Sequence, residues 1–232
     1  MEKRTARGYP HFAQRIPSGW RVVPTDAWPI NTTLGHDEDL DINEWRLQTY
    51  GDVEVKLALS YDELNQLSSA TIISDHHCID GWSYLGHEWT GIHLKDIIRI
   101  TKPTEKANFI LIECEKDMTQ CFPINQDVLF ATKRNGIPLP REGGYPLRAV
   151  APGEYGYKSV KWVKKIKFME KRELDFGDLG SIRWGIDLVP PEENPWNCDN
   201  DARKKLLRKT FSNQLLEERQ RRIGEATRNS KK

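Results

Sequence analysis

The chain has 232 residues, of which 38% are hydrophobic and 30% are charged, and its formal net charge is +1. This length fits one domain, or one domain plus a tail, and is sufficient to bury a sizeable core. The small net charge argues against a protein that binds nucleic acid over its whole surface. The longest apolar runs, such as residues 108–112, are far too short to cross a membrane.

The compartment is indicated by the N-terminus and by the cysteines. Charged residues stand at positions 2, 3, 4 and 7 with no apolar stretch behind them, so no export signal is visible and we expect a cytoplasmic protein. The chain has four cysteines: Cys78, Cys114, Cys121 and Cys198. They contain no C-x-x-C pair and are too few for a secreted disulfide scaffold. A bridge between Cys114 and Cys121 is possible, but thiols in a reducing compartment are favoured.

The first expected elements lie between residues 1 and 73. Residues 1–44 are rich in proline, tryptophan and charge without a regular period, so we expect an extended segment that wraps the domain. Residues 45–50 and 53–59 alternate between apolar and polar around a Gly-Asp turn, which predicts a hairpin. Ser60 and Glu63 have the spacing of a capping box, which opens a short helix to Gln66. A strand over 70–73 follows.

The later elements are also short. Apolar residues at helical spacing predict a helix over 91–99. Strands are expected at 109–114 and 121–124, followed by a short helix around 127–132 and a turn at Asn135-Gly136. In 160–168, Trp162, Ile166 and Phe168 alternate with lysines, as in a half-buried strand. Many strands and few helices predict an α+β fold with mostly antiparallel or mixed strands.

The composition changes near the C-terminus. From Asp201 onward there are eleven basic and four acidic residues, and Leu207, Phe211 and Leu215 lie at helical spacing. We therefore expect an N-terminal segment over 1–44, a domain over 45–190, and a basic, partly helical tail over 191–232. Docking of the tail onto the domain is favoured, with a partner protein, a nucleic acid or an anionic surface as the alternatives.

Cys78 is the first candidate for chemistry. It lies in the run SDHHCIDGWS at positions 74–83, after the 70–73 strand and before a glycine-containing turn. A deprotonated thiol at a strand end is a soft ligand for a metal. In isolation, a buried apolar role is more common for such a cysteine.

A second segment supports a functional role for Cys78. It reads PLRAVAPGEYGYKSVKW at positions 146–162, and its glycine, hydroxyl and ammonium groups suit an anion such as a phosphate. A cysteine followed by Gly-Trp-Ser, a later Gly-x-Pro-x-Arg and a Tyr-Gly-x-Lys-Ser-x-Lys-Trp run together resemble the molybdopterin-binding domain of the sulfite oxidase family. This family includes single-domain relatives related to the methionine-sulfoxide reductase catalytic subunit. The resemblance covers about residues 45–168.

The resemblance implies a sulfite-oxidase-type fold and a molybdenum–molybdopterin cofactor. It places Cys78 as metal ligand and catalytic residue. Further cofactor contacts are implied at Arg148, Lys158, Ser159, Val160 and Lys161. The implied activity is an oxidoreductase that transfers an oxygen atom to or from a small oxo-acid, S-oxide or N-oxide. No haem-binding sequence is recognisable, so electrons are expected to pass to or from a separate donor or acceptor protein.

The chain departs from the family pattern in places. Gly143 stands where the family usually has His or Asn five residues before the arginine, so we expect backbone or water to replace that contact. Cys114 lies near a family position that bears a small polar residue. Aromatic residues are available for the pocket rim, although core positions are more common for them: Trp82, Trp89, Tyr145, Tyr155 and Tyr157.

Two other interpretations remain open. The first is a zinc or thiol site at His76, His77 and Cys78, which is disfavoured because adjacent residues of a strand point to opposite faces. The second is a binding protein that keeps the fold without turnover and engages a partner through its basic tail.

Overall fold

The structure is a computed structural model that describes residues 3–5, 21–24, 40–67, 69–78, 82–114 and 118–176. The chain divides into two units, Met1–Leu179 and Gly180–Lys232, and all the described residues belong to the first. These residues form two β-sheets, two α-helices and two short 3-10 turns. No helix in this described part is long and apolar enough to cross a membrane.

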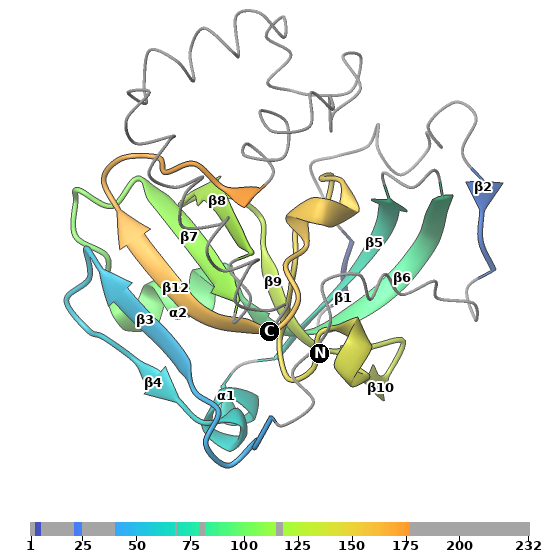
Figure 1. The fold of residues 1–232 in the computed structure, drawn as a ribbon, viewed down its shortest axis with the longest axis horizontal. Helices are drawn as coiled ribbons and strands as arrows, with labels where there is room; N and C mark the ends of the chain where they lie inside the picture. The colour runs from blue at the N-terminus through green and yellow to red at the C-terminus, as the bar shows by residue number, and fades with distance from the viewer. Residues whose placement is uncertain are drawn as a thin grey trace, which may run out of the picture. The chain divides into compact units, whose positions relative to one another are not determined.

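The first sheet carries the strand that ends in Cys78. Its strands, in spatial order, are β1 (Lys3–Thr5), β5 (Ala70–Cys78), β6 (Trp82–His93), β9 (Leu129–Arg134) and β10 (Ile137–Pro138). In addition, β11 (Arg148–Val150) pairs with β9, and β2 (Arg21–Val22) pairs with β6. β1 and β2 run parallel to their partners, and the other pairs are antiparallel. β5 and β6 lie side by side (Figure 1).

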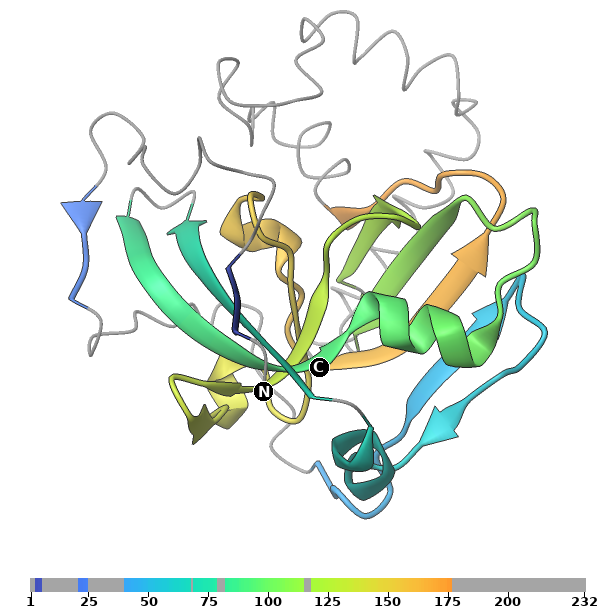
Figure 2. The ribbon, with the colours of Figure 1, turned by 180° about the vertical axis from the view of Figure 1, so that it is seen from behind.

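The second sheet stands beside the first. Its order is β4 (Ala58–Leu59), β3 (Leu47–Gly51), β12 (Val163–Met169), β7 (Phe109–Cys114) and β8 (Thr119–Pro123). β3 and β12 are parallel, and the other pairs are antiparallel. Helix α2 (Leu94–Thr101) continues directly from β6 and lies across one face of this sheet (Figure 2). The mixed, sheet-rich architecture confirms the predicted α+β class.

One hydrophobic core joins the two sheets. It contains Ile110 and Ile166 from the second sheet, Ile92 and Phe130 from the first, and Ile97 from α2, all at most 2% exposed. Because side chains of both sheets interdigitate there, the strands that carry the candidate site residues are fixed relative to one another.

The helices differ in how well the sequence predicts them. α1 (Tyr61–Gln66) has the predicted capping box: the Glu63 N–H donates to the Ser60 hydroxyl, and the Ser60 N–H donates to the Glu63 carboxylate. The predicted helix over 91–99 starts too early, since α2 begins at Leu94. Residues 91–93 end β6, and His93 is the N-cap, whose Nδ1 accepts the Lys95 N–H.

The predicted helix around 127–132 is wrong. This segment leads into β9, which pairs with β6 on one edge and with β10 and β11 on the other. Val128, Leu129, Phe130 and Ala131 are fully buried, and such a short apolar run is shared by buried helices and central strands. The predicted Asn135-Gly136 turn is confirmed, since both residues have positive φ and connect β9 to β10.

The predicted hairpin over 45–59 is shortened by a competing partner. Leu47 of β3 lies opposite Leu59 of β4. Residues 53–57 are not a strand, because the N–H groups of Glu54 and Val55 donate instead to carbonyls at the end of α2 and just beyond it.

The predicted strand over 160–168 begins only at Val163. Trp162 has a φ of 56°, so it does not share a strand face with Ile166 and Phe168, which are buried as predicted.

Several predictions on the outer parts of the chain are not tested. Most of segment 1–44 and the whole basic tail 191–232, with its expected helix, lie outside the described residues.

The strands at 109–114 and 119–123 confirm the expected ones. In their register Cys121 lies opposite Leu111, and no disulfide joins Cys114 to Cys121.

Candidate functional site

β5 places Cys78 at its last position, as the sequence predicts. Across β5 and β6, Cys78 pairs with Trp82 and His76 pairs with Tyr84. The thiol is partly buried and packs against Trp82 and Tyr84. A half-buried thiol at the end of a sheet strand remains open to a ligand on one side.

The two histidines before Cys78 lie on opposite faces of the sheet, as strand alternation requires. The His76 ring stacks on Trp82, with 5.8 Å between the ring centroids. His77 Nδ1 lies 2.8 Å from the Ser83 hydroxyl. Among the described residues, no three His, Cys, Asp or Glu side chains are grouped to hold a metal ion. This arrangement disfavours the zinc interpretation of the three residues.

Arg148 comes from the other motif and is almost completely buried. It begins β11 and is 5% exposed. Its Nη1 donates to the Gly143 carbonyl at 3.0 Å, and its guanidinium lies 5.6 Å from the centroid of the Trp89 ring. At the position where the chain departs from the family pattern, a backbone carbonyl therefore faces the arginine.

Three consecutive carbonyls of the 3-10 turn η1 (Arg141–Gly143) accept hydrogen bonds from this motif. In order of the accepting residues 141, 142 and 143, the donors are Trp162 Nε1 at 2.7 Å, Lys161 Nζ at 3.0 Å and Arg148 Nη1 at 3.0 Å. The Lys161 ammonium also lies 4.5 Å from the centroid of the Trp162 ring. One turn thus gathers two cationic side chains.

The electrostatics of this group favour a bound anion. Burial first, and then the nearby Arg148 charge, lower the pKa of Lys161 to about 8. Burial also lowers the pKa of Arg148 to about 10, while the negative charge of a Cys78 thiolate acts to raise it. Because the buried Arg148 and the partly buried Lys161 repel each other, an anion between them would be stabilising. Arg148 therefore couples the second motif to the thiol of the first.

Ser159 and Val160 face the interior beside these cations. The Ser159 hydroxyl accepts the Ala151 N–H at 3.5 Å, and the Val160 carbonyl accepts the Ala149 N–H at 2.8 Å. Ser159 is 6% exposed and Val160 is fully buried. These contacts hold the backbone of the second motif alongside β11.

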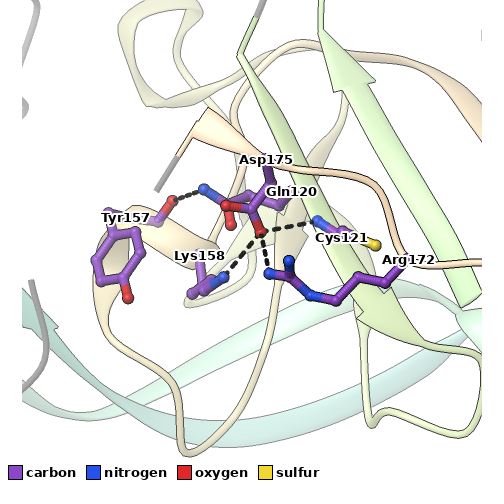
Figure 3. Close-up of polar contacts among 6 residues, drawn as sticks. All are labelled: Gln120, Cys121, Tyr157, Lys158, Arg172 and Asp175. Carbon is purple, nitrogen blue, oxygen red and sulfur yellow. Dashed lines mark hydrogen bonds and ion pairs between the residues drawn. The ribbon is translucent and has the colours of Figure 1, made fainter. Parts of the chain in front are cut away.

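Lys158 has a carboxylate partner of its own. It ends the 3-10 turn η2 (Gly156–Lys158), and its Nζ lies 3.0 Å from Asp175 Oδ2 (Figure 3). The structure thus groups Arg148 with Lys161 and directs the Lys158 ammonium to a buried acid. The predicted cofactor contact of Lys158 stays a prediction.

Three further polar residues adjoin the group. His76 belongs to the first motif, whereas no sequence motif marks His87 or Arg134. His87 is fully buried, and neither of its ring nitrogens has a hydrogen-bond partner. Burial, followed by the charge of Arg134, lowers its pKa to about 4. The Arg134 guanidinium lies 5.8 Å from the centroid of the Tyr84 ring. Burial first, and then Arg148, holds the pKa of His76 well below its usual range.

Most of the aromatic residues considered for a pocket rim belong to the interior. Trp82, Trp89 and Tyr155 are at most 6% exposed, whereas Tyr145 and Tyr157 are partly exposed. Core packing is therefore the main role of the first three.

Comparisons with known proteins indicate the same family as the two motifs. The family described as oxidoreductase molybdopterin binding domain matches residues 34–176. The protein named "Uncharacterized oxidoreductase YuiH" of Bacillus subtilis is 31% identical over 187 residues, which cover 79% of this chain and 93% of that protein. The protein-methionine-sulfoxide reductase catalytic subunit MsrP of Xanthomonas axonopodis pv. citri is 30% identical over 188 residues, with 71% and 58% covered.

A solved structure supports the fold. The sulfane dehydrogenase SoxCD of Paracoccus pantotrophus matches with a TM-score of 0.52 and 24% identity, over 57% of this chain and 40% of that one. The chain therefore spans nearly all of YuiH but little more than half of MsrP.

Proposed function

The chain belongs to the oxidoreductase molybdopterin binding domain family, and from this premise we propose that it transfers an oxygen atom to or from a small sulfur or nitrogen oxo substrate. Family membership makes it an oxidoreductase with a molybdenum–molybdopterin cofactor. The observation that carries the proposal is the placement of a partly buried thiol, Cys78, at the end of β5 in the same sheet that holds the buried Arg148 of the second motif on β11.

The residues present fit such a cofactor. A phosphate-bearing pterin needs cations shielded from solvent, and the buried Arg148 and the partly buried Lys161 supply two that repel each other in its absence. A soft metal needs a thiolate, and Cys78 ends its strand partly exposed. His87, buried with both ring nitrogens unsatisfied, supports a polar group in this interior, because buried polar atoms rarely lack partners.

Each residue has a role in the proposed arrangement. Cys78 Sγ would hold the metal, while Arg148, Ser159 and Lys161 would hold the pterin phosphate, with Val160 fixing the backbone between them. When bound, the molybdenum centre would supply the two-electron redox chemistry of oxygen-atom transfer. Arg134 offers a positive charge to an anionic substrate, and electrons would pass to or from a separate protein.

One relative indicates the class of substrate. The name of the MsrP relative, a protein-methionine-sulfoxide reductase catalytic subunit, supports an S-oxide as the first candidate substrate. Sulfite, an N-oxide and nitrate are the alternatives. The cytoplasmic location expected from the sequence stays a prediction.

Metal and pterin analysis of protein expressed in a cofactor-competent host tests the proposal. We expect equimolar molybdenum and pterin in the wild type, and turnover of methionine sulfoxide, sulfite, trimethylamine N-oxide or nitrate with an artificial electron carrier. Cys78→Ala should lose turnover and most molybdenum. Cys121→Ala, which removes a buried thiol from β8, serves as the matched control and should keep both.

Three results would contradict the proposal. Protein without molybdenum or pterin would remove its basis, and stoichiometric zinc in their place would favour a thiol–zinc site. Bound cofactor without turnover of any substrate in the panel would favour a binding protein.

A further inference from the structure

Asp175 lies at the centre of a buried polar cluster that no sequence motif marks (Figure 3). Its side chain is fully buried, and one oxygen, Oδ2, accepts from Lys158 Nζ at 3.0 Å and from the Cys121 N–H at 3.1 Å. Arg172 contributes a second cation, 3.6 Å from the same oxygen. A buried carboxylate is tolerated only with such partners, so removal of its charge must disturb all of them.

Lys158 connects this cluster to the second motif, of which it is a member. It ends η2 and directly precedes Ser159. Its ammonium lies 5.5 Å from the Tyr157 ring centroid and 5.8 Å from that of Phe122, so the side chain is enclosed as well as paired. Gln120 Nε2 donates to the Tyr157 carbonyl at 3.2 Å, which ties the same turn to β8. Gln120 and Asp175 therefore hold η2 from one side.

The other side of η2 is held by the cysteine strand. Gly156 lies so close to His76 that a β-carbon at position 156 would overlap the imidazole. The turn is thus clamped between β5, which ends in Cys78, and the Asp175 cluster. A clamped turn fixes where the following residues, Ser159 to Lys161, are presented.

We propose that Asp175 is a positioning residue for the cofactor, which acts through its ion pair with Lys158 to hold η2 and the adjoining anion-binding residues in place. Lys158 then serves the turn and not the phosphate. This inference rests on the proposed function, because it concerns the same cofactor site.

A direct contact between Lys158 and the phosphate makes the opposite prediction for Asp175. In that case Asp175 competes with the phosphate for the ammonium, so Asp175→Asn would leave cofactor binding unchanged or strengthen it. If the ion pair positions the turn, Asp175→Asn and Lys158→Met each weaken cofactor binding, and the double variant is no weaker than the single ones.

The experiment measures the rate at which holoenzyme releases its pterin, followed by fluorescence of the oxidised product, for the wild type and the three variants. We expect release on the order of ten times faster in each single variant and in the double variant, as for lost outer-shell partners of metal sites. Lys158→Arg should restore slow release, because it keeps the ion pair. Glu173→Gln breaks the nearby Lys167–Glu173 pair and should release pterin at the wild-type rate.

The outcomes separate the two proposals. A wild type that carries no pterin overturns the proposed function and this inference with it. Wild-type release by Asp175→Asn, additive effects in the double variant, or fast release by Glu173→Gln overturns the inference alone. If Asp175→Asn does not fold, the contrast between Lys158→Met and Lys158→Arg decides: equal release from both overturns the inference, whereas rescue by arginine supports it.

Discussion

Gly156 packs directly against the ring of His76, leaving no room for a β-carbon between them. His76 stands two residues before Cys78, and Gly156 stands three before Ser159. This contact therefore joins the thiol strand to the anion-binding motif, which are far apart in sequence. Glycine is required here by close approach and not by its backbone angles.

Gly156→Ala is expected to lower the cofactor content of the purified protein, because the new methyl group must displace either the turn or His76. His76→Ala should restore room, so the double variant His76→Ala/Gly156→Ala should carry more cofactor than Gly156→Ala alone. Molybdenum and pterin per chain measure both. Equal cofactor content in Gly156→Ala and the wild type would contradict the proposed importance of the contact.

Gly144, which lies between Arg148 and Lys161, gives a second prediction. Its φ is 114°, and an added β-carbon would lie 3.1 Å from Arg148 Cβ and 3.2 Å from Lys161 Cβ. Gly144→Ala should therefore lose about 1–3 kcal/mol of unfolding free energy from backbone strain, and cofactor as well. Gly136, with a φ of 77° and open space around it, is the matched control.

Gly136→Ala carries comparable backbone strain without crowding. It should lower stability in urea unfolding but leave the cofactor content unchanged. Loss of cofactor in Gly136→Ala as well would assign the effect of Gly144→Ala to general instability.

Local signals made part of this fold predictable. The capping box at Ser60 and the Asn135-Gly136 turn depend on neighbouring residues alone, and both form as expected. β9 is different, because it forms a strand through long-range pairing with β6 and β11 as well as with its neighbour β10. The apolar run from Val128 to Ala131 fits a helix or a strand equally well until that pairing is known.

The site divides in the same way. Cys78 and Arg148 belong to motifs with recognisable spacing, and the structure places both in the first sheet, where the charge of a Cys78 thiolate acts to raise the pKa of Arg148. Asp175 reads in sequence as one more charge in the run Arg172-Glu173-Leu174-Asp175, which is typical of a solvated surface. Only the long-range contact with Lys158 reveals that its carboxylate is buried.

Ile166 tests the core that fixes the two motifs. It is fully buried in the cluster shared by both sheets, so Ile166→Ala should reduce the unfolding free energy by about 2–5 kcal/mol. Ile137 is 69% exposed, and Ile137→Ala should change it by less than about 0.5 kcal/mol. Urea unfolding of cofactor-free protein measures both, and equal effects would contradict the described packing.

The lowered pKa of Lys161 predicts opposite effects of pH on the stability of the cofactor-free protein and on its affinity for the cofactor. Burial lowers its folded-state pKa to about 8, from an ordinary value of 10.5. Above about pH 8 the folded chain therefore releases a proton that the unfolded chain keeps, so the stability of cofactor-free protein should rise with pH in this range. Cofactor affinity should fall over the same range, because the ammonium that would pair with the phosphate is lost.

Measurements between roughly pH 7 and 9 separate this lysine from Arg148, because the pKa of Arg148 is lowered only to about 10. The affinity of cofactor-free protein for added pterin cofactor should fall with pH in the wild type, and Lys161→Met should bind the cofactor weakly with little pH dependence. Lys164→Met, which removes a lysine from β12, should follow the wild-type profile. A pH profile in Lys161→Met as steep as that of the wild type would show that another group controls the cofactor affinity, because the substituted side chain carries no proton to lose.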